Sequence, residues 1–537
     1  MTVLLALTPG LIFVFLWIWK IGSREAGLPP GPPTLPLLGN LHMFPKSLAH
    51  FKLTEWARKY GGIYSLKIGP GTAVVLTDVA AVKELMEKRS GSTADRPSMY
   101  VAELVTGGLQ MALARYSDKW RILRRTAHAI LTPQASLRHI PIQRAEAIQL
   151  LHDLRHHPEG FYTHIQRTAN SIIMSVLYGK RSPRFETKQT TTFYKVLHDW
   201  EGILAPGATP PVDLIPILKY VPERWAKWKQ MCAKTRRNQR DLYFGWLDET
   251  RDRLHSGNEN GGYMEDVLKR QDELGLDREM TGYLGSSLTE AGSDTTAAYI
   301  HSLVLALVAF PEVQRKAQEE MDRVVGEHRM PTLEDLEEMP YLRAVILETH
   351  RFRPVTPLFI PHSAVNDEQY KGFRIPKGCT IFVNAWGIFH DPVLFEDPEM
   401  FVPERYLLTP NGTKPEVGLD ASDLRPNFSF GVGRRSCPGI HVAQNSININ
   451  AMNLIWAFNL SSPTDTNGNS ISVDTFKYQT GLASGPSPFE CKIATRSAKK
   501  AELIESEFVE STDTFLKFEH GLDAEDKQFV AEVRARR

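Results

Sequence analysis

The residues best suited to chemistry surround one cysteine, Cys437, in the glycine-rich segment 428–439, FSFGVGRRSCPG, just before an apolar, helix-like run at 440–458. A helix N-terminus offers free N–H groups and the positive end of the helix dipole, and both favour a thiolate. Glycines let the backbone approach a flat ligand, and Arg435 can pair with an anionic group of that ligand. The glycines of the segment are Gly431, Gly433 and Gly439. This combination favours a cysteine that binds haem iron from one side over a merely buried cysteine in a loop.

A second candidate is the hexapeptide AGSDTT, residues 291–296, inside the helix-like stretch 279–309. A glycine such as Gly292 costs about 1 kcal/mol inside a helix, so its presence needs a reason. The hydroxyl of Thr295 can bond back to the preceding turn and open the helix locally. Together with Asp294 it could deliver protons to a reacting oxygen, and such general acid–base help is worth roughly 10²–10⁴ in rate. Taken alone, the hexapeptide also fits a bent structural helix.

The cysteine segment resembles the F-x-x-G-x-R-x-C-x-G signature of the cytochrome P-450 superfamily, matched at Phe430, Gly433, Arg435, Cys437 and Gly439. The hexapeptide matches the family's A-G-x-D-T-T motif, and the resemblance runs from about residue 28 to about residue 495, in the style of microsomal fungal members. It implies a mainly α-helical fold with small β-sheets, a helical prism around a buried haem. It also implies haem b with Cys437 as the axial thiolate and metal ligand, and electrons from NADPH through a separate reductase.

The resemblance also assigns the other site residues. Trp120 and Arg124 lie one helical turn apart, so they point the same way, and they match the family's W-x-x-x-R motif. A tryptophan N–H and a guanidinium suit a haem propionate, whereas the alternative is an amphipathic helix with a snorkelling arginine. By resemblance the haem-binding residues are Cys437, Trp120, Arg124, His362, Arg435, Phe430 and Gly431, and the catalytic pair that relays protons is Asp294 and Thr295.

An acid and a base three residues apart, Glu348 and Arg351, lie on one face of a helix predicted to end at 353–354. Chance pairs of this kind are common and are worth under about 1 kcal/mol at a surface. The family folds such a pair with a later arginine, here Arg405, into a buried cluster beneath the haem. Loss of one member would then cost about 3–5 kcal/mol, and the role of the cluster is structural.

Periodicity predicts the elements that position these residues. Apolar side chains at three- and four-residue spacing predict helices at 115–131, 142–155, 161–179, 226–253, 279–309 and 311–325. Alternation predicts a hairpin at 63–76 that turns at 69–71, and further short strands fit 370–385. The proline-rich segment 205–222 fits a linker or, by resemblance, a connection over the substrate entrance that touches the membrane. Residues 254–264 are expected to form an exposed loop.

The composition excludes several other classes of protein. The 537 residues are 42% hydrophobic with a formal net charge of +1, which allows a sizeable core and gives no general attraction to nucleic acid. Four widely spread cysteines without a C-x-x-C pair fit reduced thiols rather than a disulfide scaffold. His152 and His156 have the i, i+4 spacing of metal ligands, but no third ligand is evident, so an exposed helix face is favoured.

The N-terminal run from Val3 to Trp19 is almost wholly apolar and is followed by Lys20 and Arg24. No positive side chain precedes it and no small-residue cleavage site follows it, which favours a retained transmembrane signal anchor over a cleaved signal peptide. The positive-inside rule then predicts a single-pass protein of the endoplasmic reticulum membrane with its catalytic domain in the cytosol. The predicted domains are the anchor at 1–20, a proline-rich hinge at 21–36, a haem-thiolate monooxygenase domain at 37–495, and a charged, solvated or partly disordered C-terminal extension at 496–537.

The sequence therefore predicts a membrane-anchored monooxygenase that uses O₂ to hydroxylate or epoxidise a lipophilic small molecule, by resemblance in fungal secondary-metabolite biosynthesis. Its predicted partners are this substrate, O₂, a cytochrome P-450 reductase and, as an optional electron donor, cytochrome b5, whereas nucleic acid is not among them. Two alternatives remain open: a haem-thiolate isomerase or dehydratase that needs no reductase, and a non-catalytic haem-based gas sensor. The acid–threonine pair argues against both.

Overall fold

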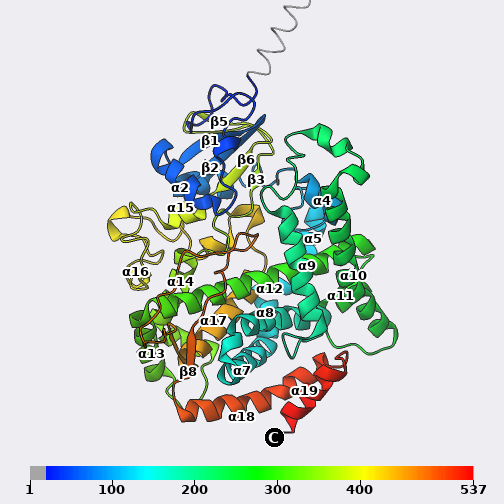
Figure 1. Cartoon of the computed structure of the whole chain (residues 1–537), viewed down its shortest axis with the longest axis vertical. Coiled ribbons are helices and arrows are strands. Elements are labelled where there is room, and N and C mark those ends of the chain that lie inside the picture. Colours follow the sequence, from blue (N-terminus) through cyan, green and yellow to red (C-terminus); the bar gives the residue numbers. More distant parts are fainter. Residues whose placement is uncertain (1–19, 536–537) are drawn as a thin grey trace, which may run out of the picture.

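The computed structural model describes residues 20–535, and helix α12 (Arg278–Ala309) crosses the middle of the molecule (Figure 1). The helix begins after Asp277, whose side chain accepts a hydrogen bond of 2.7 Å from the N–H of Met280. Most of its residues are buried. A helix that is apolar on all sides needs neighbours on all sides, so the other elements pack around α12.

The helices expected from periodicity are all confirmed, with ends that differ by a few residues at most. The long helices besides α12 are α2 (Ala49–Tyr60), α5 (Asp118–Leu131), α7 (Ile140–His156), α8 (Phe161–Tyr178), α9 (Lys188–Leu204), α10 (Lys227–His255), α13 (Pro311–Val324), α14 (Pro340–Phe352) and α17 (Ile440–Ala457). The shorter ones are α3 (Val79–Val82), α4 (Tyr100–Thr106), α6 (Pro133–Ser136), α11 (Tyr263–Lys269), α15 (Ala385–Phe389) and α16 (Arg405–Leu408). The mainly helical fold predicted from the sequence is therefore the fold of the described residues.

The strands form small sheets beside the helices. The largest has the order β1-β2-β6-β3, in which β1 (Ile63–Ile68) and β2 (Gly71–Leu76) are antiparallel, β6 (Thr380–Val383) is parallel to β2, and β3 (His362–Ser363) is antiparallel to β6. The hairpin at 63–76 is thus confirmed. Two further pairs are β4 (Glu368–Tyr370) with β5 (Phe373–Ile375), and β7 (Phe458–Ser461) with β8 (Lys492–Thr495).

The expected cluster of one acid and two arginines is present and buried. Glu348 of α14 accepts hydrogen bonds from Nε and Nη2 of Arg351 at 2.7 and 2.8 Å, and from Nε of Arg405 at 3.2 Å. The other donors of Arg351 go to backbone carbonyls of Phe389, Pro398 and Met400. The cluster therefore connects α14 to the segment that precedes the cysteine loop, and its role is structural.

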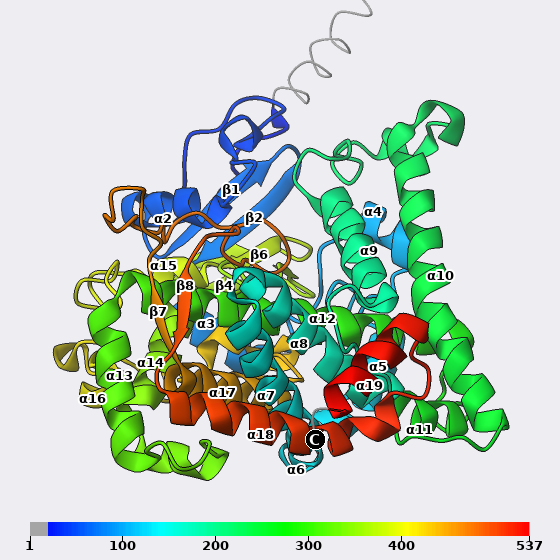
Figure 2. The same ribbon diagram turned by 60° about the horizontal axis from the view of Figure 1, so that its bottom comes forward.

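The C-terminal extension is folded, in contrast to the prediction from the sequence. Residues 498–515 and 524–534 form α18 (Ala498–Phe515) and α19 (Ala524–Arg534), and α18 runs alongside α7 (Figures 1 and 2). Its apolar residues Ile504, Phe508 and Phe515 are buried in the same core as α7 and α12. The prediction of a solvated or partly disordered tail is wrong for these residues, because their high charge hid an amphipathic pattern.

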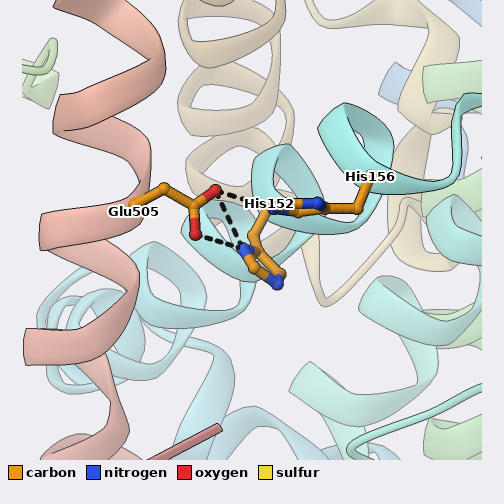
Figure 3. A group of neighbouring side chains, drawn as sticks. All are labelled: His152, His156 and Glu505. Carbon is orange, nitrogen blue, oxygen red and sulfur yellow. Dashed lines mark hydrogen bonds and ion pairs between the residues drawn. The ribbon is translucent and has the colours of Figure 1, made fainter. Parts of the chain in front are cut away.

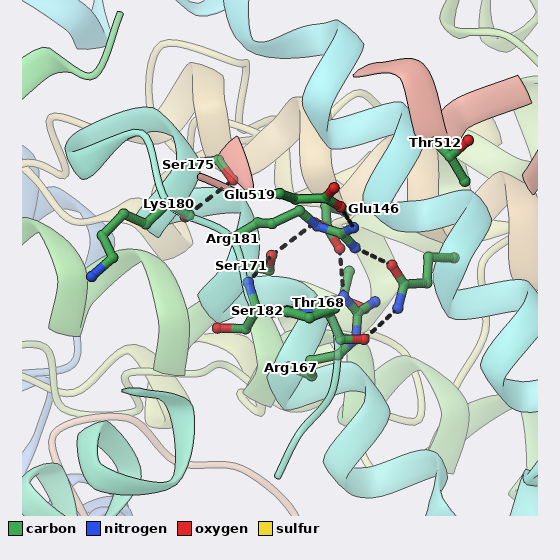
Figure 4. A network of polar contacts seen from close by, with 12 residues as sticks. Glu146, Arg167, Thr168, Ser171, Ser175, Lys180, Arg181, Ser182, Thr512 and Glu519 are labelled. Carbon is green, nitrogen blue, oxygen red and sulfur yellow. Dashed lines mark hydrogen bonds and ion pairs between the residues drawn. The ribbon is translucent and has the colours of Figure 1, made fainter. Parts of the chain in front are cut away.

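A buried polar network further joins the extension to the body (Figure 4). Glu146 of α7 accepts hydrogen bonds from Nη1 of Arg167 at 2.5 Å and from Nε of Arg181 at 3.1 Å. Nη1 of Arg181 donates to Glu519 at 2.8 Å, and Arg534 pairs with the other oxygen of Glu519. A buried arginine loses the hydration of its positive charge, so each of these arginines needs a carboxylate partner to compensate.

The surface segments follow their predictions in part. Residues 254–261 lie mostly at the surface, but Tyr263 and Met264 are buried and begin α11, so the expected exposed loop ends earlier than 264. In the proline-rich connection, Ile217 and Tyr220 are 73% and 84% exposed.

The predicted N-terminal anchor helix lies, except for Lys20, outside the described residues. Within 20–535, no single helix has the length and apolar character to cross a membrane, and only the pair α12 and α13, bent by 104°, meets that test together.

Candidate active site

The loop around Cys437 is closed by backbone contacts. The N–H of Cys437 donates a 2.7 Å hydrogen bond to the carbonyl of Phe430, which makes the loop fold back on itself. Gly431 and Gly433 have φ angles of 84° and 60°, which favour glycine. A Cβ at Gly433 would also lie 2.1 Å from the carbonyl oxygen of Met86. No other residue fits at position 433 without moving the neighbouring backbone.

Cys437 lies just before α17, as the sequence analysis expected. Burial raises the pKa of its thiol, while the N–H of Gly439 and the nearby guanidinium of Arg124 act in the opposite direction, and burial outweighs them. Arg124 also donates a hydrogen bond to the carbonyl of Ser436, next to the cysteine. A thiolate here would therefore need a further positive partner, and a metal ion is such a partner.

Three arginines lie together beside this loop, of which Arg96 and Arg435 are buried and Arg124 is half-buried. Arg96 donates to the carbonyls of Ala112, Ile360 and Pro361 at 2.9, 2.6 and 3.0 Å. Arg435 donates to the carbonyls of Ala94 and Ala114 at 2.7 and 2.8 Å. Burial lowers the pKa of Arg96, Arg124 and Arg435, for Arg435 to about 10, and the charges of Arg124 and Arg435 lower that of Arg96 further.

Within residues 20–535, none of these three arginines has a carboxylate oxygen at ion-pair distance, and Asp95, which partly offsets the lowered pKa of Arg96 and Arg435, is itself paired with Arg115 at 2.5 Å. Buried charges of one sign are costly unless an opposite charge joins them. The cluster is therefore built for an anion with at least one carboxylate-like group. Two haem propionates fit that requirement, so the residues present fit a haem.

Trp120 and His362 lie beside the same arginines, and their predicted contacts with haem stay predictions. The indole N–H of Trp120 donates to the carbonyl of Met111 at 3.2 Å, and its ring lies 3.9 Å from the guanidinium of Arg435. Nδ1 of His362 bonds to the carbonyl of Thr93 at 2.8 Å, and burial together with Arg96 lowers the pKa of this imidazole to about 3. Trp120 therefore supports Arg435, and His362 is neutral.

The middle of α12 has an accessible face. The hydroxyl of Thr295 donates a 2.6 Å hydrogen bond to the carbonyl of Ala291, as expected for a threonine that bonds back to the preceding turn. Ala291 is exposed and Thr295 half-buried, although the residues before and after this stretch are buried. Gly292 has a packing reason as well, because a Cβ there would lie 2.8 Å from a side-chain carbon of Ile173 in α8.

Two carboxyl groups beside this face have raised pKa values. Burial and the nearby Glu290 raise the pKa of Asp294 to about 6. Burial, Asp294 and Glu290 raise the pKa of Glu201 in α9 to about 8. Perturbed carboxyl groups of this kind gather at functional sites.

Sequence reasoning missed Glu201 and the anion-binding character of Arg96. Glu201 is one acid among several in an amphipathic helix, and Arg96 is a lone arginine in a loop. Neither belongs to a motif with a fixed spacing. Only the fold brings them to the residues that the motifs identified.

Residues 29–493 match the cytochrome P-450 family. The chain is 46% identical to a cytochrome P-450 monooxygenase of Armillaria gallica over 95% of this chain and 97% of that protein. It is 39% identical to the monooxygenase yanC of Aspergillus niger, covering 91% of this chain and 93% of the relative. Among solved structures, a zebrafish cytochrome P-450 determined with abiraterone has the same fold, with a TM-score of 0.65, 23% identity, and coverage of 83% of this chain and 100% of that one.

Proposed function

Because this chain belongs to the cytochrome P-450 family and is a haem-thiolate monooxygenase, we propose that Cys437 binds the iron of haem b and that the substrate is a lipophilic small molecule. One observation carries the assignment of the site: three buried or half-buried arginines lie beside the cysteine loop, and none of them has its own carboxylate at ion-pair distance within the described residues. Haem is a ligand that carries both an iron for the thiolate and carboxylates for the arginines.

In this proposal the residues of the chain have separate roles. Cys437 is the metal ligand, and Arg96, Arg124 and Arg435 bind the propionates together with Trp120 and His362. The ring of Trp120 also lies against the guanidinium of Arg435 and holds it in place. Phe430 and Gly431 shape the loop. When bound, the haem supplies the centre at which O₂ is reduced with electrons from a reductase and one oxygen atom is transferred to the substrate.

Asp294 and Thr295 hold and move the protons that oxygen reduction consumes. The carboxyl of Asp294 has a pKa of about 6, so near neutral pH it can both take up and release a proton. The bond from Thr295 to Ala291 keeps the threonine hydroxyl at the accessible face of α12. A proton path that ends at this face supports turnover rather than simple gas binding.

The substrate and the setting are proposed on chemical grounds. The segments that the family places around the substrate carry apolar side chains, with Val355, Leu358 and Leu482 among them, which supports hydroxylation or epoxidation of a lipophilic compound. The apolar segment at 3–19 supports an anchor in the endoplasmic reticulum membrane, with a cytochrome P-450 reductase and optionally cytochrome b5 as cytosolic electron donors. The fungal relatives support a role in secondary metabolism.

The alternative activities make opposite predictions in one experiment. Haem-loaded enzyme is mixed with lipophilic metabolites, and compounds that shift the spin state of the ferric haem are then incubated with NADPH, reductase and ¹⁸O₂. The proposal predicts a product that carries one ¹⁸O atom and depends on the reductase. Conversion without NADPH would favour the isomerase or dehydratase, and stable oxygen binding without any product would favour the sensor.

A further inference from the structure

The C-terminal extension places a carboxylate against the histidine pair of α7. His152 and His156 lie on one face of α7, and the carboxylate of Glu505 in α18 points toward both of them (Figure 3). Nδ1 of His152 lies 3.1 and 3.2 Å from the two carboxylate oxygens, and Nε2 of His156 lies 2.9 Å from Oε1. The third ligand that the sequence did not reveal is therefore supplied by residues that the sequence analysis expected to be solvated or disordered.

We propose that His152, His156 and Glu505 form a binding site for a divalent transition-metal ion such as Zn²⁺. Imidazole nitrogens and a carboxylate oxygen are ligands that Zn²⁺ prefers. The three candidate ligand atoms all lie within 4.8 Å of one another. On a tetrahedral ion with bonds of about 2.0–2.1 Å, ligand atoms lie about 3.3–3.4 Å apart, so the present spacing needs only small side-chain movements.

A positive charge already lies at this group, because Nη1 of Arg155 donates a 2.5 Å hydrogen bond to Oε1 of Glu505. Nε2 of His156 lies 2.9 Å from Oε1 of Glu505, which accepts, and 3.1 Å from Nη1 of Arg155, which donates. A single ring nitrogen is either a donor or an acceptor, so it satisfies only one of these neighbours. As a metal ligand the same nitrogen offers its lone pair, and so does the carboxylate. Arg155, whose side chain is 31% exposed, can turn towards solvent and leave the position to the ion.

The surroundings suit a site that is partly preformed and open on one side. The ring of Phe508 stacks on that of His152 at a centroid distance of 4.2 Å and holds the imidazole in place. A surface hollow of about 360 Å³, lined by His152, Glu505, Phe508 and Val533 among others, adjoins the group. It gives an ion access and leaves room for water as a fourth ligand. The bound ion would link α18 to α7, so it would fasten the extension to the body of the enzyme.

The test uses full-length, haem-loaded protein without an affinity tag, treated with EDTA and dialysed, and titrated with ZnCl₂ by isothermal titration calorimetry. We expect one Zn²⁺ per chain and a higher melting temperature with Zn²⁺. His156→Ala and Glu505→Gln should each weaken binding at least about tenfold. Arg155→Ala should bind Zn²⁺ as tightly as the wild type or more tightly, because it removes the competing cation. His157→Ala, with an imidazole that is 71% exposed, is the matched control and should bind like the wild type.

The outcomes separate a metal site from a simple polar contact between two helices. His156 is exposed, so its variant is expected to fold, and an unchanged haem spectrum would verify this. Binding that is absent in the wild type, unaffected by Glu505→Gln, or lost in Arg155→Ala would overturn the proposal. If Zn²⁺ binding were also lost in His157→Ala, the ion would be binding surface histidines without a defined site, and this result would overturn the proposal too.

Discussion

The hydroxyl of Thr295 donates a 2.6 Å hydrogen bond to the carbonyl oxygen of Ala291, one turn earlier in α12. This carbonyl would otherwise accept only the N–H of residue 295, so the side chain competes with the helix at a stretch in the middle of α12 where the face is accessible. The bond fixes where the hydroxyl lies, one residue after Asp294, whose carboxyl has a raised pKa.

Thr295→Ala tests the proposed proton relay. The variant should consume NADPH and O₂ but release most of the reducing equivalents as hydrogen peroxide, because the hydroxyl that guides protons is gone. Product, peroxide and NADPH are measured together. Thr289→Ala is the matched control, since Thr289 makes the same bond, at 2.8 Å, to the carbonyl of Gly285 but is fully buried. Full coupling in Thr295→Ala would refute the relay.

The pKa of Asp294 predicts a pH dependence. An ordinary aspartate loses its proton near pH 3.8, whereas burial and Glu290 hold this one until about pH 6. Between these values the folded state binds more protons than the unfolded state, so the stabilising contribution of the group is complete below pH 3.8 and is lost as the pH rises through 6. The melting temperature of Asp294→Asn relative to the wild type should therefore rise over this interval. A difference that stays constant from pH 4 to pH 7 would contradict the raised pKa.

Glu348→Gln should destabilise the fold strongly. The variant leaves Arg351 and Arg405 buried without a negative partner, and breaking a buried pair in this way costs about 3–5 kcal/mol. Chemical unfolding followed by tryptophan fluorescence gives the free energy of unfolding, and the amount of bound haem gives a second readout. Glu319→Gln, which removes an exposed partner of Arg315, should cost under about 1 kcal/mol. Equal effects of the two variants would contradict a buried structural cluster.

The C-terminal extension is expected to contribute to stability through Glu519. Glu519→Gln replaces the carboxylate that pairs Arg181 with the extension, and the loss should be about 3 kcal/mol, because both groups are buried. Glu525 is 84% exposed in its pair with Arg184, so Glu525→Gln should change the free energy of unfolding by less than about 1 kcal/mol. If Glu519→Gln unfolds like the wild type in urea, the extension is not tied to the body in the way described.

Sequence patterns predicted the parts of this fold that depend on local periodicity and fixed motifs. The helices at 115–131 and 279–309 and the hairpin at 63–76 follow from such patterns, whereas the buried partners of Glu348 were implied by the family resemblance. The resemblance identified the site, since its motifs have fixed spacing around Cys437 and Thr295.

Contacts between distant segments could not be predicted in this way. The charges of α18 indicated a solvated tail, because nothing in residues 498–515 shows that α7 offers an apolar face to Ile504 and Phe508. For the same reason, the sequence does not predict that Glu505 lies beside His152 or that Arg96 lies near Arg435. Each of these pairs exists only once the chain has folded.

The most direct test is the absorbance spectrum of the purified, haem-loaded protein after reduction and addition of carbon monoxide. Coordination by Cys437 predicts the red-shifted Soret band that a thiolate opposite carbon monoxide produces. The band should disappear in Cys437→Ser and persist in Cys491→Ser, the matched control. Folded, haem-loaded wild-type protein without this band, or a Cys437→Ser variant that retains it, would contradict the account.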